Sequence, residues 1–191
     1  MQQIEAMKLY TLTGIFLIAL LTACGGESKT DEAEGDAASD LPAVLQTSVT
    51  TADLSEHFIN ASIIIPDSNR AKSHAEIYVN DFGETRVQVG TIYNIVIAEL
   101  LEGDLNSYRQ GLADDLTYTH EIIEEGSDYV LYKSVIIDSH LDPEFHFYAI
   151  KDIDGVKYEI HDYSEEGGYA ESIARMMLES VNHMNVNNPA T

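Results

Sequence analysis

The residues of this sequence best suited to chemistry are its seven histidines. None of them stands in a His-x-His or His-Glu-x-x-His arrangement, spacings that place two imidazoles on one metal ion. His120, His146 and His161 fall in segments that alternate like β-strands, so these three could approach one another on adjacent strands. Zinc needs three or four ligands that converge, and scattered surface histidines explain the pattern more simply. We therefore predict no metal site and no cofactor, and leave open whether the three histidines converge. Three acidic residues lie close to them in the sequence: Glu121, Glu159 and Asp162.

Nucleophilic catalysis has no motif in this chain. The sequence contains no Gly-x-Ser-x-Gly elbow, no phosphate-binding loop and no dinucleotide fingerprint. Gly126-Ser127-Asp128 falls in an expected hairpin turn, and acidic residues are too numerous for one pair to stand out as a glycosidase couple. A hydrolase would require a histidine and a carboxylate that converge near a serine or a metal. We predict that the protein is not an enzyme.

Asp152-Ile153-Asp154-Gly155 has a superficial likeness to a calcium-binding loop. The further acidic ligands of an EF-hand are absent at the required spacing. Asp154-Gly155 between two apolar runs instead predicts a β-hairpin with a type I′ turn. Clustered carboxylates still leave weak binding of divalent cations open.

The single cysteine, Cys24, stands at the end of an apolar stretch. Lys8 supplies a positive charge, Leu9 to Leu21 is an apolar run of 13 residues, and small residues lead into the cysteine, which is the order of a secretory signal. Leu21-Thr22-Ala23-Cys24 resembles the lipobox of bacterial lipoproteins. This resemblance implies cleavage by signal peptidase II, removal of residues 1–23, and lipidation: a diacylglycerol on the Cys24 sulfur and usually a third acyl chain on the new amino terminus.

The same segment has two alternatives to the lipobox. A transmembrane helix needs about 20 apolar residues, which is more than this run offers. An ordinary secreted protein with a free Cys24 is the other alternative, and Met7 is a more typical start for the leader than Met1. A lipidated Cys24 cannot act as a nucleophile, a metal ligand or half of a disulfide. The exported domain is therefore expected to rely on its core for stability.

Residues 24–40 are predicted to tether the domain to the membrane. Residues 25–40 hold six acids and one base among glycine, alanine, serine and threonine, a composition typical of a disordered linker. Gly25 stands where an aspartate would mark inner-membrane retention in the enterobacterial sorting rule, which favours the outer membrane. The acids also loosely resemble the surface-export signals of some Bacteroidota lipoproteins. The expected location is the cell envelope, at the periplasmic face of the outer membrane or the cell surface.

The charge of the predicted domain, residues 41–191, limits its partners. This segment has 26 acidic and 8 basic residues, hence a net charge of −18. Such a charge disfavours nucleic acid and anionic lipid head groups as partners. It suits a basic protein partner, divalent cations or a salt-rich exterior.

The same segment is long enough for a single domain with a core. A short helix is expected within 41–58, with Asp53 as its N-cap. The stretch 92–101 is ambiguous between strand and helix, and we predict a strand. The other strands are expected at 61–65, 75–81, 85–90, 118–125, 129–138, 145–152 and 156–163.

Two further helices are expected. Asp104 caps the first, whose Leu105, Tyr108 and Leu112 fall on one face. The second covers 169–183 and is followed by a tail, 185–191, expected to fray. Its apolar stripe, which we interpret as core packing, consists of Ile173, Met176, Met177, Val181 and Met184.

The two faces of the predicted sheet differ in polarity. The segment 129–138 is apolar on both faces, which predicts a strand covered on two sides. In the hairpin 145–163 one face is apolar by parity, and the other is wetter. The wetter face carries His146, Tyr148, Lys157, Glu159 and His161.

Local hairpins with helices between and after them predict an α+β domain, an antiparallel sheet with helices packed on it. The expected elements follow in this order: a strand that ends at Ile65-Pro66, a hairpin, a helix after Gly103-Asp104-Leu105, a meander, and a last helix with Met and Ser. This order resembles the PsbP-like α/β/α sandwich, which also occurs in bacterial lipoproteins. The resemblance implies a binding or assembly module rather than an enzyme.

The function predicted from the sequence is a noncatalytic, lipid-anchored envelope lipoprotein that binds another protein. Eleven tyrosines are compatible with an interface, although tyrosine also fills sheet positions by propensity. A solute- or cation-binding lipoprotein is the alternative, and it predicts a concave, polar-lined pocket between sheet and helices. A hydrolase is the third possibility.

Overall fold

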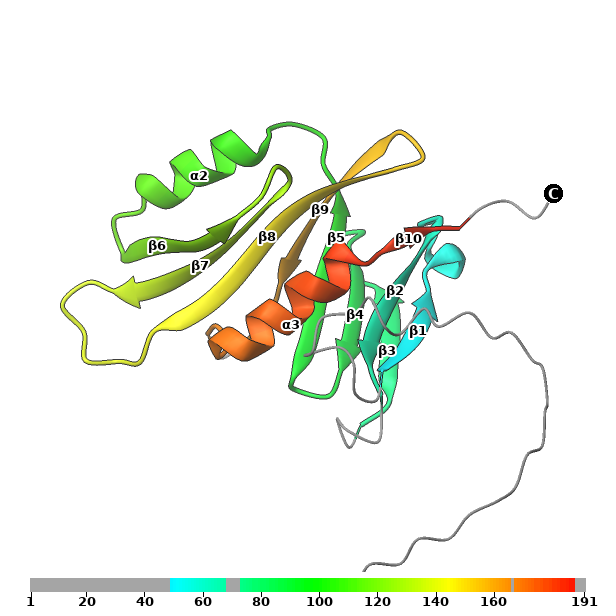
Figure 1. Ribbon diagram of the computed structural model, residues 1–191, viewed down its shortest axis with the longest axis horizontal. Coiled ribbons are helices and arrows are strands. Elements are labelled where there is room, and N and C mark those ends of the chain that lie inside the picture. Colours follow the sequence, from blue (N-terminus) through cyan, green and yellow to red (C-terminus); the bar gives the residue numbers. More distant parts are fainter. Residues whose placement is uncertain (1–48, 68–72, 166, 188–191) are drawn as a thin grey trace, which may run out of the picture. The chain divides into compact units, whose positions relative to one another are not determined.

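The computed structural model describes residues 49–67, 73–165 and 167–187 (Figure 1). The predicted signal segment 1–23, Cys24, the acidic tether 25–40 and residues 41–48 lie outside the described residues. The predictions of cleavage, lipidation and tethering therefore stay predictions. All of the described residues fall within one compact unit of the chain.

The fold is α+β, as predicted, with two antiparallel sheets and two helices among the described residues. The larger sheet has seven strands in the order β3-β4-β5-β9-β8-β7-β6. Each strand pairs antiparallel with its neighbours. The strands are β3 (Ala75–Val79), β4 (Thr85–Val89), β5 (Tyr93–Glu99), β6 (Tyr118–Glu125), β7 (Tyr129–Ile136), β8 (Glu144–Ile153) and β9 (Val156–Asp162).

The smaller sheet corrects two predictions. It has the order β1-β2-β10, with β1 (Val49–Asp53), β2 (Ala61–Pro66) and β10 (Asn185–Val186). The short helix expected within 41–58 is a 3-10 helix, η1 (Ser55–His57), and its N-cap is Leu54 rather than Asp53. Strand β1 precedes it, because β-branched residues at the start of β1 favour a strand. Asp53 still accepts from the Ser55 N–H at 3.0 Å. The fraying expected after 184 is wrong for β10, which pairs with β2.

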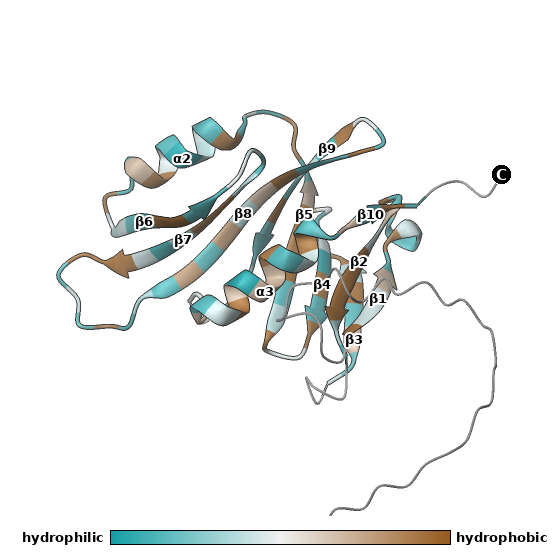
Figure 2. Cartoon of the chain, viewed as in Figure 1, coloured by the Kyte–Doolittle hydropathy of each residue, from teal (hydrophilic) through white to brown (hydrophobic). Residues whose placement is uncertain are grey.

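Helix α3 (Glu171–Asn182) lies on one face of the larger sheet and contacts β2 of the smaller one. It begins and ends close to the predicted bounds, and its methionine stripe packs in the core as expected, with Met176 and Met177 buried. Ser180, also buried, donates to the Ile64 carbonyl of β2 at 2.5 Å. Figure 2 shows that β2 is hydrophobic through most of its length, as its place in this core requires. Neither this helix nor any other described one is long and apolar enough to cross a membrane.

Helix α2 (Leu105–Ala113) lies on the opposite face, beside β6 and β7 (Figure 1). Asp104 caps it as predicted: its carboxylate accepts from the Ser107 N–H at 2.8 Å, and Ser107 Oγ accepts from the Asp104 N–H at 2.8 Å. The residues of α2 that pack on the sheet are Leu105, Tyr108 and Leu112, the three predicted from their spacing. Strand β7 is therefore covered on both faces, with Leu131 under α3 and Val130 under α2.

The hairpin β8–β9 turns at Asp154-Gly155, where φ is 54° and 84°. Positive φ at both central residues is the property of a type I′ turn, which the sequence predicted. Opposite residues of the hairpin, such as Ala149 with Ile160 and Tyr148 with His161, confirm the predicted division into two faces. The polar face is the one that α2 partly covers.

Candidate functional site

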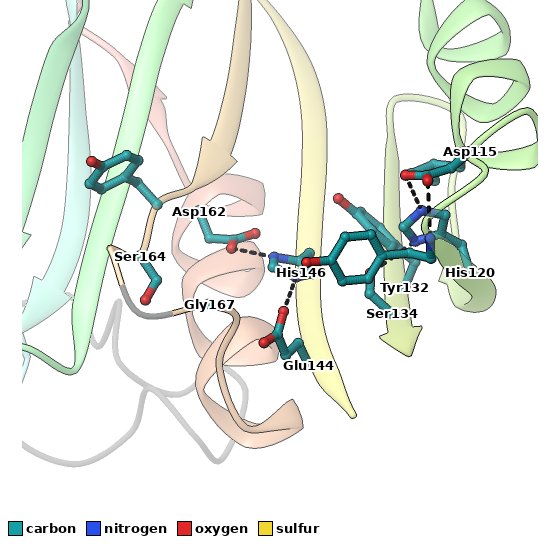
Figure 3. Close-up of a pocket in the computed structure, with 12 residues that line it drawn as sticks. Asp115, His120, Tyr132, Ser134, Glu144, His146, Asp162, Ser164 and Gly167 are labelled. Atoms are coloured by element: carbon teal, nitrogen blue, oxygen red, sulfur yellow. Dashed lines mark hydrogen bonds and ion pairs between the residues drawn. The ribbon is translucent and has the colours of Figure 1, made fainter. Parts of the chain in front are cut away.

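The face of the sheet that carries α2 contains a pocket of about 420 Å³. It lies beyond the helix, over β6, β7 and β8, and the segment after β9 forms its other wall (Figure 3). A volume of this size falls within the range of about 300–1,000 Å³ that small-molecule sites occupy. Its lining residues are Leu112, Asp115, Tyr118, His120, Tyr132, Ser134, Glu144, His146, Asp162, Tyr163, Ser164 and Gly167.

His120 is the centre of the first polar group in the pocket. It lies on β6 directly opposite Ser134 of β7, so the two side chains share a face. Ser134 Oγ lies 2.9 Å from His120 Nδ1, and Asp115 Oδ2 lies 3.1 Å from His120 Nε2. The histidine is thus held from both ring nitrogens, by a hydroxyl and a carboxylate.

Asp115 is fixed by the loop between α2 and β6. Its Oδ1 accepts from the backbone N–H groups of Thr117 at 2.6 Å and Tyr118 at 3.0 Å. These backbone hydrogen bonds, together with the one to His120, lower the pKa of Asp115 to about 2. Asp115 is therefore a carboxylate under ordinary conditions, and its second oxygen orients the imidazole of His120.

His146 is the centre of the second polar group. It lies on β8, and its Nδ1 is 2.8 Å from Oδ2 of Asp162, the last residue of β9. The Asp162 side chain is 4% exposed, and its Oδ1 accepts from the Phe147 N–H at 2.7 Å. Glu144 Oε2 lies 3.8 Å from His146 Nε2. The buried carboxylate of Asp162 is therefore hydrogen-bonded through both oxygens.

The electrostatics favour a charged His146. Burial opposes the imidazolium, but the hydrogen bond to Asp162 and the negative charges of Asp162 and Glu144 outweigh it and raise the pKa of His146 above 6.5. A buried charge needs a partner of this kind to be tolerated. His146 and Asp162 are hydrogen-bonded at a position largely removed from solvent, and protonation of His146 makes them an ion pair.

Tyrosines connect the two polar groups and join them to α2. The Tyr132 ring lies between the histidines, with its centroid 5.6 Å from that of His120 and 5.4 Å from that of His146. Its hydroxyl lies 2.8 Å from that of Tyr108, which stacks on Tyr148 with a centroid distance of 3.7 Å. Burial raises the pKa of Tyr108 to about 12 and also raises the pKa of Tyr132, so both are neutral hydrogen-bonding groups.

Two glycines bring the segment after β9 against β8. A Cβ atom at Gly168 would lie 2.7 Å from His146 Nε2, and one at Gly167 would collide with the Glu144 carboxylate. Gly167 also has φ of 111°, which L side chains rarely adopt. Paired backbone hydrogen bonds between Phe145 and Tyr169, at 2.9 and 3.2 Å, hold the segment in place. This wall of the pocket is thus built by backbone in contact with Glu144 and His146.

The structure answers the question left open for the three histidines. His120 and His146 line one pocket, whereas His161 does not, and its Nδ1 lies 2.8 Å from the backbone oxygen of Asp162. His120 and His146 are not on adjacent strands, because β7 runs between β6 and β8, whereas His161 is on β9, next to β8. Of the three acidic residues noted close to the histidines in the sequence, Asp162 lines the pocket and the other two do not. Glu121 pairs with Lys133 at the surface, and Glu159 accepts from the Tyr148 hydroxyl at 2.9 Å.

Sequence analysis missed Asp115, Ser134 and Glu144 as pocket residues. Parity could have found Ser134, because β7 was expected to expose alternate residues to the face that carries His146. Asp115 lies in the loop between α2 and β6, and its position is set by the turn in which it accepts from the N–H groups of Thr117 and Tyr118. Among the residues that the structure describes, no group of three or more histidine, cysteine and acidic side chains is arranged to hold a metal ion.

Comparisons with protein-family models, with curated proteins and with solved structures find no match for this chain. The resemblance to the PsbP-like sandwich therefore stays a prediction.

Proposed function

We propose that this protein is a lipid-anchored envelope lipoprotein whose α+β domain binds a small solute in the pocket beside α2. The pocket supports this proposal through its built polar lining: two histidines, each hydrogen-bonded to an aspartate, face one cavity from separate strands. Buried polar groups at the bottom of a concave, partly aromatic site are the usual means of orienting a ligand. Among the hypotheses drawn from the sequence, solute binding is the one that required a polar-lined pocket between sheet and helices.

The test is a thermal-shift screen of the full chain, purified in detergent, against small cations, anions and neutral solutes. A ligand that binds only the folded state at about 100 times its Kd stabilises it by about 2.7 kcal/mol, which gives a clear rise in Tm. The variant Leu112→Trp enlarges a lining residue and should reduce that rise. Leu116→Trp, four residues along and 92% exposed, is the matched control and should leave the rise unchanged. A screen with no rise, or a rise equal in both variants, contradicts the proposal.

A hydrolase is the second candidate, because Asp115, His120 and Ser134 form a hydrogen-bonded chain. In such an enzyme the Ser134 oxygen would attack an acyl carbon, its proton would pass to His120 Nδ1 and then to the leaving group, and water would release the acyl chain. Two features favour binding instead. Ser134 is 3% exposed, and its backbone is paired with strands on both sides, which leaves no adjacent N–H groups for an oxyanion.

A fluorophosphonate probe separates the two candidates. Hydrolysis predicts covalent labelling of the full chain that disappears in Ser134→Ala and persists in Ser127→Ala, a serine in the turn between β6 and β7. Solute binding predicts no labelling. Labelling of Ser134 would replace the first proposal with the second.

The anchor is a separate part of the proposal and rests on Leu21-Thr22-Ala23-Cys24. More than one acyl chain holds a protein stably at a membrane. Cys24→Ala should therefore move the protein from the membrane fraction to the soluble fraction. Persistent membrane partitioning of this variant would contradict lipidation, whatever the pocket binds.

A further inference from the structure

The charges around the pocket are unbalanced. Three carboxylates line it, those of Asp115, Glu144 and Asp162. None of its described lining residues is a lysine or an arginine, so the two histidines supply its only basic groups. The guanidinium of Arg86 lies 3.7 Å from the ring centroid of Tyr163, a lining residue, and pairs with Glu84 at 3.3 Å. An anionic ligand would meet a negative field in this pocket.

The three carboxylates differ in what they already bind. Asp115 accepts from two backbone N–H groups and meets His120, and Asp162 accepts from the Phe147 N–H and His146. Among the contacts of the described residues, the Glu144 carboxylate approaches one group, His146 Nε2, at 3.8 Å. A carboxylate has about four acceptor sites. Of the three lining carboxylates, Glu144 therefore has the fewest partners among the described residues and the most capacity for a ligand.

Aromatic rings complete the environment of that carboxylate. Tyr118, Tyr132 and Tyr163 line the same pocket as Glu144. Their faces attract cations through the ring quadrupole, and their apolar surface suits the methylene or methyl groups of an organic cation. The net charge of −23 on the chain adds a long-range attraction for positive solutes.

We infer that the solute is a small organic cation, an amine or a quaternary ammonium, with its charge beside Glu144 and its carbon atoms against the tyrosine rings. This inference rests on the proposed function and names the chemical class of the ligand. The backbone at Gly167 and Gly168 runs close to Glu144, because a Cβ atom added at either glycine would collide with the Glu144 side chain. Asp115 and Asp162 act as positioning residues for the histidines.

The experiment is calorimetric titration of the full chain in detergent with choline, putrescine, the uncharged carbon isostere of choline, and succinate. Choline or putrescine should bind, and choline should bind at least about tenfold more tightly than its isostere, the factor that about 1.4 kcal/mol of charge recognition gives. Glu144→Gln should lower the affinity for the bound cation by about tenfold. Glu102→Gln removes one negative charge from an exposed loop outside the pocket and should leave the affinity unchanged. Added salt should weaken binding of the cation.

Each contrary result has a defined meaning. If the isostere binds as tightly as choline, or if succinate binds and neither cation does, the pocket still binds solutes and only the inference of a cation is overturned. If a cation binds equally to Glu144→Gln and to the unaltered chain, the site is not at Glu144 and the inference is again overturned. If neither the four probes nor the wider solute screen gives binding, both the inference and the proposed function are contradicted.

Discussion

The two faces of strands β7 and β8 are built from neighbouring residues and differ in kind. On the face under α3, Leu131 and Phe147 are fully buried in an apolar cluster. On the face under α2, Tyr132 and His146 take part in a network of hydroxyl, imidazole and carboxylate groups. Because side chains alternate along a strand, a step of one residue separates a packed core from a polar pocket.

The helices explain this difference. Helix α3 has 12 residues and buries six side chains, whereas α2 has 9 residues and buries only Leu105. A short helix covers part of a sheet face, and the uncovered remainder meets water or a ligand. Polar groups there must be hydrogen-bonded to be tolerated. The face under α3 therefore supplies stability, and the face under α2 has room for a site.

The largest effect should come from breaking the apolar face. Phe147→Ala removes a side chain with 0% exposure and should lower the free energy of unfolding by about 3–5 kcal/mol. Tyr148→Phe, at the next position on the other face, removes only the hydroxyl bonded to Glu159 and should cost about 1 kcal/mol. Urea denaturation of both variants measures the contrast. Equal losses would show that the two faces do not divide stability as described.

The next effect tests the polar face at its most buried point. Asp162→Asn keeps the shape of the side chain but removes the charge that faces His146, and should lower the free energy of unfolding by about 1–3 kcal/mol. Asp128→Asn removes one partner of the exposed Lys151 pair and should cost less than about 1 kcal/mol. Chemical denaturation of the two variants gives the comparison. If Asp162→Asn leaves the free energy of unfolding unchanged, the interaction between Asp162 and His146 contributes nothing to stability.

Much of the fold follows from local pattern. The bounds of β6 agree with alternation in the sequence, α2 begins after the predicted Asp104 cap, and the β8–β9 turn falls at Asp154-Gly155. These features depend on residues close in the chain. The pairing of β5 with β9, and of β10 with β2, joins segments far apart and depends on global packing. Single-sequence periodicity carries no information about such pairs.

The site was less predictable than the fold for the same reason. Sequence analysis named His120 and His146, and it made a hydrolase conditional on a histidine and a carboxylate that converge near a serine or a metal. Which serine and which carboxylate converge depends on the register of β6 on β7 and on the loop that holds Asp115. The irregularity in the β6–β7 register between Ile122 and Glu124 is also invisible in the sequence. Parity assigns a residue to a face, and register assigns its neighbours.

A smaller effect should separate the hydroxyl of Tyr132 from its ring. Tyr132→Phe removes the hydrogen bond to Tyr108 but keeps the ring between the two histidines, and should lower the free energy of unfolding by about 1 kcal/mol. Binding of the solute should persist, because the hydroxyl points to Tyr108 beneath α2. Leu131→Ala, the adjacent residue on the apolar face, should cost about 2–5 kcal/mol. Thermal unfolding and titration of the two variants measure stability and binding separately, and loss of binding in Tyr132→Phe would place the hydroxyl in the site.

The smallest effect concerns pH and belongs to the polar face alone. The folded-state pKa of His146 is raised above 6.5, because the hydrogen bond and charge of Asp162, with the charge of Glu144, outweigh burial. Folding therefore favours the protonated imidazole. The stability that this contributes is complete below the unfolded pKa and is lost as the pH rises through the folded pKa. Asp115 behaves in the opposite sense, because its pKa is lowered from 3.8 to about 2. Its contribution to stability is present above pH 3.8 and is lost as the pH falls from 3.8 through about 2.

His146→Gln isolates this contribution. The groups that face His146 are Asp162 from β9, Glu144 from β8, Tyr132 from β7 and the backbone at Gly168, and all of them remain in the variant. The stability of the unaltered chain relative to His146→Gln should therefore be greatest near pH 5 and should decline as the pH rises above about 6.5. Denaturation of both proteins across this range measures the difference, and Phe147→Ala should show a loss that does not vary with pH. A difference that instead grows with pH would mean that His146 is neutral in the folded protein, and that Asp162 is held by hydrogen bonds without an ion pair.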